Sequence, residues 1–489
     1  MRSVTAPVGG WNTRDALDSM DPTDAVVLDN FFPETGKVSL RKGYAQHATG
    51  VGNGDVQTLA EYHAGTTRKL IAAGAGGLYD ATSSGAASSI QTGYTSNKWQ
   101  WVNFNGQLHL VNGEDAPQMY DGSINTPSWS GSGLTTSDLI GVEVFKNRLF
   151  FWEKDSQDFW YAAINAVTGT LTKFPLSRVG SLGGNIVAIG TWTMDAGQGV
   201  DDRLVIILSS GQAAVYQGTD PGDSTAWAIV GIYNIGAPLD RRAIAKVAGD
   251  LFIATDEDYV SFAEVWRKGE FKDRESKISG AAAAAARSYA ANFGWQIIHY
   301  PRGNRVIVNV PETASRYRQH VVNTLTGAWC RFTDMNARCW GLYNRDLYFG
   351  GDGGIVYKAD TGFNDNSANI DAEAQTAWNA FGSPTPKRFS QLRTLVGGSG
   401  SLGLTQGLAF DFGEVLVEQA TSSETDGLTW DDFFWDDEFW SPEVTTRDGW
   451  LSVTGEGHAT SLRLRYAGTV ENLVWYRTDY VFEPGFGLT

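Results

Sequence analysis

A hairpin-like pattern recurs along most of the chain and limits the folds that it can adopt. In residues 344–360, an apolar strand is followed by a Gly/Asp turn and by a second apolar strand. Gly, Asn and Asp tolerate the positive φ of tight turns, and the flanking residues alternate as half-buried strands do. Similar units lie at residues 70–80, 107–121, 148–161, 203–216, 250–258 and 305–309. The pattern predicts about seven hairpin units, spaced roughly 40 to 55 residues apart.

This spacing is the period expected of propeller blades. One hairpin cannot bury both of its faces, whereas several four-stranded sheets around an axis can, and they expose only short edges. High Gly and aromatic content, with 57 Gly and 18 Trp, also favours turns and sheet faces over helices. The sequence therefore predicts a mainly β fold with a propeller-like body. A set of unrelated hairpins in one large sandwich is the alternative.

Changes in residue composition and in hydrophobic patterning predict three parts in the 489 residues. Residues 1–45 are interpreted as an N-terminal arm that docks or contributes to a platform. Residues 46–365 form the propeller-like body. Residues 366–489, which contain well-alternating strands, are interpreted as an antiparallel β-sandwich-like module that completes the platform.

Local signals predict several individual elements. Residues 21–28 indicate a short helix with Asp21 at its N-cap and Pro22 in the first turn, followed by a turn at 30–36 and a strand at 38–44. The six alanines at 281–286 indicate a short helix, or a packed strand and loop. Residues 372–381 fit a strand or a helix.

The composition argues against several classes of function. The net charge is −17, and an acidic protein is a poor sequence-independent binder of nucleic acid, because phosphate contacts need Lys and Arg. A negative charge would keep DNA from sticking to the wall of a channel. Solubility is the commoner reason for such a charge. No run of about 18 apolar residues is present, so no membrane anchor is expected. The start lacks the apolar core of a signal peptide.

No motif predicts catalytic, cofactor-binding or metal-binding residues. The chain lacks a Gly-x-Ser-x-Gly elbow, a His-Glu-x-x-His pair and a phosphate-binding Gly loop, and its six histidines are scattered. Cys330 and Cys339 have no zinc-site spacing. We interpret them as reduced thiols, with a cross-strand disulfide as the alternative.

Residues 429–440 place Trp and Phe beside acidic residues, with Trp-Asp-Asp repeated every five residues. That period suits neither a helix nor a strand, so a loop is expected. It is a candidate for a lumen constriction or a subunit seam. The alternatives are rings pinned into a neighbouring surface and, less simply, a Ca²⁺ site without EF-hand spacing. The acidic residues concerned are Asp431, Asp432, Asp436, Asp437 and Glu438.

Two separated stretches carry a resemblance to a known family. The first reads Gly-Trp-Asn-Thr-Arg-Asp at 10–15, continues through residues 20–33, and ends with Val-Ser-Leu-Arg-Lys-Gly-Tyr at 38–44. The second reads Asn-Thr-Leu-Thr-Gly-Ala-Trp-Cys-Arg-Phe at 323–332. Together they resemble the nozzle, or tail tubular (tail-hub), proteins of short-tailed, podovirus-type bacteriophages, in which the first pattern precedes a propeller-like body.

The resemblance implies a structural component of the virion tail and no enzyme activity. It implies a homo-oligomeric ring, a hexamer, that extends the channel of the portal and its adaptor (the head-to-tail connector). The ring would retain double-stranded DNA and let it pass during ejection, without sequence-specific binding. The implied partners are the adaptor, a tail fibre or spike, and a needle or plug.

The arm is the part expected to dock against a neighbour or the adaptor. Exposed aromatic rings among Asp and Arg are typical of interface cores. The candidate interface residues are Trp11, Arg14, Asp15, Phe31, Phe32 and Tyr44.

Two other functions stay open from the sequence. The first is a propeller enzyme that degrades glycans. Residues 423–430 resemble the Asp-box of sialidase-type propellers, with the Asp one place late and the box present once. Among 55 acidic residues, a catalytic carboxylate pair can also arise by chance. The second is a receptor-binding adhesin, although no heptads or collagen-like repeats are present.

Overall fold

The computed structural model describes residues 1–176, 183–195, 200–269, 276–398, 403–414, 419–420, 445–447, 449–469 and 473–484. Strands make up 55% of the chain and helices 6%, which confirms the mainly β fold. The chain divides into two compact units. The first unit holds residues 1–45, 320–333 and 360–489, and the second holds residues 46–319 and 334–359.

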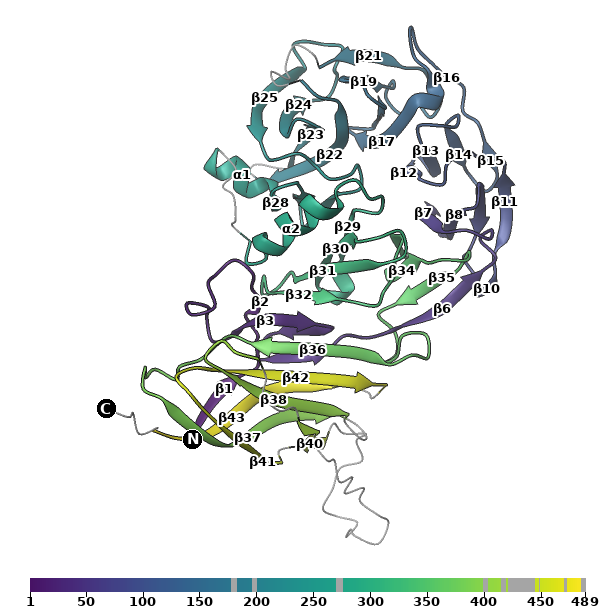
Figure 1. The fold of residues 1–489 in the computed structure, drawn as a ribbon. Coiled ribbons are helices and arrows are strands. Elements are labelled where there is room, and N and C mark those ends of the chain that lie inside the picture. The colour runs from purple at the N-terminus through teal and green to yellow at the C-terminus, as the bar shows by residue number, and fades with distance from the viewer. Residues whose placement is uncertain are drawn as a thin grey trace, which may run out of the picture. The chain divides into compact units, whose positions relative to one another are not determined.

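The second unit is a propeller, and Figure 1 shows its sheets arranged in a circle. Its first four blades are antiparallel sheets of four strands each. Blade one contains β7 (Val56–Ala64), β8 (Thr67–Gly74), β9 (Gly77–Asp80) and β11 (Ser88–Thr92). Blade two contains β12 (Gln100–Phe104), β13 (Gln107–Val111), β14 (Gln118–Tyr120) and β15 (Ile124–Asn125). Blade three contains β17 (Leu139–Phe145), β18 (Arg148–Glu153), β19 (Asp158–Tyr161) and β21 (Thr172–Pro175). Blade four contains β22 (Ile186–Asp195), β23 (Val200–Leu208), β24 (Gln212–Gly218) and β25 (Trp227–Asn234).

The remaining three blades are less regular. Blade five contains β26 (Ile244–Val247), β27 (Asp250–Ala254) and β28 (Tyr259–Ser261), followed by helices α1 (Phe262–Lys268) and α2 (Ser279–Tyr289). Blade six begins with β29 (Gln296–Tyr300) and β30 (Arg305–Pro311), and β30 pairs with β31 (Tyr317–Asn323). Blade seven contains β33 (Cys339–Tyr343), β34 (Asp346–Gly350), β35 (Val356–Ala359), β6 (Tyr44–Thr49) and β10 (Gly85–Ala86). Short accessory elements are β16 (Trp129–Ser130), which pairs with β20 (Gly169–Thr170), and the 3-10 turns η1 (Thr136–Asp138) and η2 (Pro301–Gly303). The seven blades match the predicted number of hairpin units.

Blade seven closes the ring, because it combines strands from both ends of the repeat. Its sheet order is β10-β6-β35-β34-β33, so β6 completes a sheet whose other main strands lie about three hundred residues later. Val51 N–H donates to the carbonyl of Gly354 (3.0 Å), and Val56 N–H donates to that of Gly351 (3.0 Å). Ala48, Val51 and Val56 are buried in one core with blades one and seven. The closure pairs β6 and β35, so neither of these two strands is an edge of the sheet.

Aromatic side chains fill the spaces between neighbouring blades. Between blades three and four, Phe150, Trp152, Phe159 and Trp227 share a core with apolar residues of β22 and β23. Phe150 and Trp227 stack with their ring centroids 6.2 Å apart, which offset-stacked rings favour. Large aromatic rings fill the space between neighbouring blades, which accounts for the high Trp content of the chain.

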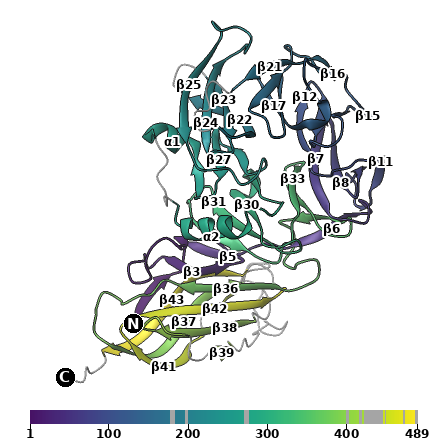
Figure 2. The ribbon, with the colours of Figure 1, turned by 45° about the horizontal axis from the view of Figure 1, so that its top comes forward.

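The first unit is a sandwich of two sheets. One sheet runs β4 (Phe31–Glu34), β5 (Lys37–Leu40), β43 (Val474–Pro484), β37 (Lys387–Gly398) and β40 (Thr445–Arg447), with β1 (Arg2–Thr5) on β43 and β41 (Leu451–Gly457) on β37. The other runs β32 (Trp329–Phe332), β3 (Asp24–Asp29), β36 (Ile370–Thr376), β42 (Thr460–Gly468), β38 (Leu404–Phe410) and β39 (Gln419–Ala420), with β2 (Gly10–Trp11) on β3. Figures 1 and 2 both show β36, β42 and β38 side by side. Between the sheets, the rings of Phe389 and Phe410 lie 5.5 Å apart, and Thr394 Oγ1 donates to Gln406 Oε1 (2.6 Å).

The expected arm and the expected C-terminal module therefore share sheets within one unit. The helix predicted for residues 21–28 is wrong, because Asp24–Asp29 form strand β3. β3 pairs with β2, β32 and β36, and this pairing overrides a local cap signal in a stretch that contains Val26 and Val27. The turn predicted for residues 30–36 is shorter than expected. Phe31–Glu34 form strand β4, so the turn contains only Thr35 and Gly36.

Two open alternatives are resolved. The alanine run forms α2, with Ala282, Ala285 and Ala286 on its buried face. Residues 372–376 continue strand β36. In the described parts of the chain, none of the helices combines the length and the apolar character needed to cross a membrane.

The closing strand provides a test of the propeller. Ala48 is fully buried on β6, so we expect Ala48→Asp to lower the free energy of unfolding by roughly 3 kcal/mol or more, because an unpaired carboxylate enters an apolar core. The measurement is urea unfolding followed by tryptophan fluorescence. Ala45→Asp, the same change at an exposed position of the same strand, is the control and should change stability little. Equal effects of the two variants would contradict a closing role for β6.

Candidate functional site

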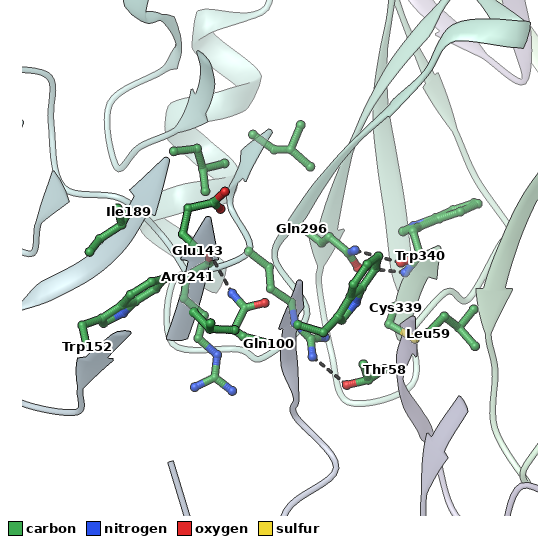
Figure 3. Close-up of a pocket in the computed structure, with 15 residues that line it drawn as sticks. Thr58, Leu59, Gln100, Glu143, Trp152, Ile189, Arg241, Gln296, Cys339 and Trp340 are labelled. Carbon is green, nitrogen blue, oxygen red and sulfur yellow. Dashed lines mark hydrogen bonds between the residues drawn. The ribbon is translucent and has the colours of Figure 1, made fainter. Parts of the chain in front are cut away.

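A small polar cavity lies where the first strands of the blades begin (Figure 3). Its volume is about 200 Å³, and every blade contributes to its wall. The cavity, called here the axial cavity, therefore lies on the common axis of the blades. A cavity of this size admits several water molecules. The lining residues are Thr58, Leu59, Gln100, Trp101, Val142, Glu143, Trp152, Ile189, Arg241, Arg242, Ile244, Gln296, Ile297, Cys339 and Trp340.

Arg242 joins three blades at the wall of the axial cavity. Its Nη1 donates to the carbonyl of Gln57 (2.7 Å), and its Nη2 donates to Thr58 Oγ1 (2.7 Å) and to the carbonyl of Trp99 (2.7 Å). The residue is buried, and this burial lowers the pKa of its guanidinium. Arg242 directly precedes blade five, so its contacts tie that blade to blades one and two.

Two glutamines make similar links, which Figure 3 shows as dashed lines. Gln100 Nε2 donates to the carbonyl of Arg241 (3.1 Å). Gln296 Nε2 donates to the carbonyl of Trp340 (2.9 Å), and Trp340 N–H donates to Gln296 Oε1 (2.8 Å). The polar side chains around the cavity thus hold the blades in register.

Glu143 is the titratable group of most interest in the axial cavity. Burial raises the pKa of its carboxyl to about 7, while the N–H of Val144, which donates to Oε1 (3.2 Å), and the charge of Lys246 act in the opposite direction. Burial and the nearby Arg242 lower the pKa of Arg241 to about 10. Among the described residues that line this cavity, Glu143 is the one carboxylate. It can exchange a proton near neutral pH, but the usual glycoside hydrolysis needs two carboxylates.

No metal or redox chemistry emerges from the residues that the structure describes. Their His, Cys, Asp and Glu side chains form no group of three or more that could hold a metal ion. Cys330 and Cys339 are both buried, and no disulfide joins them. Burial raises the pKa of Cys339 to about 12, so its thiol stays protonated and unreactive near neutral pH.

A second cluster of polar residues lies in the first unit, and it is built around Arg41. The Arg41 guanidinium is fully buried and binds both carboxylate oxygens of Asp365, with Nη1–Oδ1 at 2.8 Å and Nη2–Oδ2 at 2.6 Å. Arg41 Nε donates to Asn30 Oδ1 (2.7 Å). Asn30 Nδ2 in turn donates to Thr333 Oγ1 (2.8 Å) and to the carbonyl of Asp371 (2.6 Å).

The same cluster joins the two stretches that carry the sequence resemblance. Arg331 binds Asp29 through two contacts, Nε–Oδ1 at 2.7 Å and Nη2–Oδ2 at 2.5 Å, and its guanidinium lies 5.2 Å from the ring centroid of Trp11. Asn323 Nδ2 donates to the carbonyl of Pro33 (2.8 Å). We call Trp11, Asp29, Asn30, Arg41, Asn323, Arg331 and Asp365 the motif cluster.

Most of the predicted interface residues of the arm are not on the surface. Trp11, Phe31 and Phe32 are buried, and Tyr44 is half-buried. The expectation that Trp11, Phe31 and Phe32 are exposed for docking is therefore wrong, and the part of Tyr44 in docking stays a prediction. The three buried rings fill the core of the first unit: the indole N–H of Trp11 donates to the carbonyl of Val26 (3.1 Å), and Phe32 packs edge-on against Phe332.

Two groups of predicted residues remain without a structural outcome. Arg14 and Asp15 form a partly exposed ion pair (2.8 Å), and their part in docking stays a prediction. The acidic residues of the candidate lumen or seam loop, Asp431, Asp432, Asp436, Asp437 and Glu438, lie outside the described residues.

Sequence reasoning missed the axial cavity, although two signals were available. Glu143 interrupts an otherwise apolar strand, Leu139–Phe145. Arg241 and Arg242 form a basic pair directly before the first strand of blade five. Neither signal shows that first strands from seven blades converge, because that convergence requires the closed ring.

No family model matches the chain, and no curated protein matches it. Solved structures that are similar include BBS1N in complex with ARL6DN (10% identity, TM-score 0.40, covering 67% of this chain and 100% of that one). They also include YCF48 bound to D1 peptide (10%, 0.37, 70% and 99%) and the exo-beta-1,3-galactanase of Phanerochaete chrysosporium with galactose (9%, 0.25, 77% and 95%). At these TM-scores the likenesses carry no argument, and the propeller assignment rests on the sheet topology described above.

The raised pKa of Glu143 predicts a pH dependence of stability. The carboxyl has a higher pKa in the folded chain (about 7) than in the unfolded chain (4.5), so its contribution is present below pH 4.5 and is lost as the pH rises towards 7. Glu143→Gln should remove this loss, and the variant should gain up to about 3 kcal/mol over the wild type between pH 5 and pH 8. Urea unfolding across this range measures the effect. Glu114→Gln, at an exposed position, is the control, and an identical pH profile for Glu143→Gln and wild type would contradict the assignment.

The motif cluster predicts a large cost for removing its central cation. Arg41→Met removes the guanidinium that binds both oxygens of the buried Asp365 carboxylate, and we expect a loss of about 3–5 kcal/mol in the free energy of unfolding. The double variant Arg41→Met/Asp365→Asn should recover part of that loss, since it also removes the negative charge that Arg41 neutralised. Arg14→Met, in a partly exposed pair, is the control and should cost less than about 1 kcal/mol. Equal losses for Arg41→Met and Arg14→Met in thermal or urea unfolding would argue against the cluster's role.

Proposed function

We propose that the chain is a structural subunit of a short-tailed phage tail, a nozzle or tail tubular protein. In this proposal, copies of the chain form a ring that extends the portal–adaptor channel, retains DNA in the virion and lets it pass during ejection. The protein has no enzymatic activity in this role. Its partners are further copies of itself in a hexamer, the adaptor, a tail fibre or spike, and a needle or plug.

The motif cluster is the observation that supports this proposal most. The resemblance rests on two stretches nearly three hundred residues apart in the sequence, and they are in contact: Asn323 donates to the carbonyl of Pro33, and Arg331 binds Asp29. Chance similarity in two short stretches gives no reason for them to be in contact. A resemblance in the residues that hold the first unit together is what a shared framework would produce.

The size of the axial cavity supports the ring as the conduit. A cavity of about 200 Å³ is far too small for a DNA duplex, so DNA cannot pass through the propeller of one copy. A channel for DNA must then lie between copies. Closed rotational symmetry with head-to-tail contacts lets one chain build such a ring.

The charge of the chain fits a wall past which DNA slides. A net charge of −17 repels a polyanion, whereas a binding groove would be rich in Lys and Arg. The proposal therefore includes double-stranded DNA as a passing cargo without sequence-specific contacts.

A glycan-degrading enzyme is the second candidate function, and Glu143 is the observation that favours it. A carboxyl with a pKa near 7 is suited to act as a general acid. The axial cavity, however, offers it no second carboxylate among its described lining residues. No comparable observation favours a receptor-binding adhesin.

A direct test is to locate the chain in virions. An epitope tag on this chain, visualised by electron microscopy of intact particles, should appear on the tail axis below the portal, in a ring whose copy number native mass spectrometry of isolated tails reports. The control is the same tag on the major capsid protein. Label on the capsid shell, or a strictly monomeric chain in the particle, would refute the nozzle role. Release of sugars from host surface glycans, lost in Glu143→Gln, would establish the enzyme instead.

A further inference from the structure

Three Asn-Gly pairs occur in the chain, at residues 53–54, 105–106 and 112–113. Asparagine followed by glycine is the dipeptide most prone to deamidation, because glycine has no side chain to hinder its own backbone nitrogen from attacking the asparagine side chain. The attack requires that the asparagine amide be free to turn towards that nitrogen. The three pairs differ in this respect in the propeller, so the fold selects among them.

Asn112 is the most strongly held of the three asparagines. It is buried, and its Nδ2 donates to the carbonyl of Ser96 (3.0 Å) and to Asp115 Oδ2 (2.7 Å). Its Oδ1 accepts from the N–H groups of Glu114 (3.0 Å) and Asp115 (2.8 Å). These bonds must break before the side chain can turn, so deamidation of Asn112 requires local opening of the blade.

Asn105 is exposed, but the turn that contains it is fixed. It joins β12 to β13 in a two-residue hairpin loop, in which Asn105 (φ 50°) and Gly106 (φ 74°) both have the left-handed backbone that such tight turns need. Asn105 Nδ2 also donates to the carbonyl of Asn165 (3.1 Å). The paired strands and this bond limit how far the side chain can turn towards the nitrogen of Gly106.

Asn53 differs from both, because its reacting groups are unengaged. Its side chain is exposed, and among the described residues neither that side chain nor the N–H of Gly54 makes a hydrogen bond. Neither residue has the positive φ of the Asn105 turn. The two atoms that must meet, Asn53 Cγ and the backbone nitrogen of Gly54, are therefore free to approach one another.

We propose that Asn53 is a site of spontaneous deamidation in the folded chain, ahead of Asn105 and Asn112. The backbone nitrogen of Gly54 loses its proton to hydroxide and forms a bond with Cγ of Asn53. The bond between Cγ and Nδ2 breaks, and the side-chain nitrogen takes a proton from water and departs as ammonia, so a cyclic succinimide remains. Water then opens this ring at either of its carbonyls and gives aspartate or isoaspartate.

The place of Asn53 in the fold gives the reaction a structural consequence. Gly354 N–H donates to the carbonyl of Gly54 (2.7 Å), and Val51 N–H donates to that of Gly354 (3.0 Å), so the chain on both sides of Asn53 is bonded to the turn between β34 and β35. Isoaspartate inserts a methylene group into the backbone between these two anchor points. The lengthened backbone no longer matches the spacing of the two bonds, so deamidation loosens the segment that closes the ring.

The test is peptide mapping by mass spectrometry of the full chain after incubation at mildly alkaline pH, with fresh protein as the reference. In the folded chain, Asn53 should deamidate roughly tenfold faster than Asn105, and faster still than Asn112, because hydrogen bonds at those two sites must break first. In urea, where the fold no longer distinguishes the sites, the three rates should converge. Equal rates in the folded chain, or a faster rate at Asn105 or Asn112, would overturn the proposal.

Gly54→Ala is a variant that should slow the reaction without disturbing the fold. The added Cβ hinders the attacking nitrogen, whereas in the fold its nearest neighbour is Ala75 Cβ at 3.7 Å, an ordinary contact, and Gly54 lacks the positive φ that disfavours alanine. Fresh Gly54→Ala should unfold at the wild-type midpoint and lose Asn53 several-fold more slowly. Equal loss of Asn53 in both proteins would contradict the attack by the Gly54 nitrogen. The wild-type comparison of the three sites does not depend on this variant.

The loosening of the ring has its own measurement. After the same incubation, wild-type protein should have a lower midpoint of urea unfolding than fresh protein, whereas Gly54→Ala should keep its midpoint. An unchanged midpoint in wild-type protein that mass spectrometry shows to be deamidated at Asn53 would overturn this consequence.

Discussion

The first unit depends on one buried ion pair, Arg41–Asp365. An arginine without solvent contact is stable only when its donors are satisfied, and here Asp365, Asn30 and the carbonyl of Thr333 accept from it. Those acceptors come from three separated stretches of the chain, so the cluster forms only when all three are folded together. Desolvation offsets much of the attraction between the two charges, so the net contribution of the pair to stability is smaller than the cost of removing one partner. Arg331–Asp29, which is partly exposed, strengthens the same arrangement at a lower desolvation cost.

The propeller satisfies a different constraint, the exposure of sheet edges and faces. Each blade buries its faces against its neighbours, and aromatic rings fill those spaces. The ring is complete only because β6 joins blade seven, which makes the fold dependent on contacts between residues far apart in the sequence. Polar links around the axis, from Arg242, Gln100 and Gln296, add hydrogen bonds that a slipped blade would lose. Packing therefore supplies most of the stability, and these bonds fix the register.

The sequence was sufficient to predict the repeated hairpins of the propeller. It was insufficient to predict which strands pair when they lie far apart in the chain. Hairpin periodicity gave seven blades and the β class, because alternation and turn residues act locally. Residues 21–28 were misread as a helix, since Asp21 and Pro22 are genuine start signals and the pairing of β3 with distant β36 leaves no local trace. The rings of Trp11 and Phe32 were assigned to an exposed interface for the same reason: the residues against which they pack, Arg331 and Phe332, lie about three hundred residues later in the chain. Glu143 could not be identified as a buried acid either, because its environment is assembled from several blades.

In the axial cavity of the propeller, the buried charges are balanced by the residues of the fold itself. Every donor of Arg242 named above has a carbonyl or hydroxyl acceptor, and Glu143 adjusts to burial by holding its proton to near-neutral pH. The site is satisfied by its own residues, which suits a structural role on the axis.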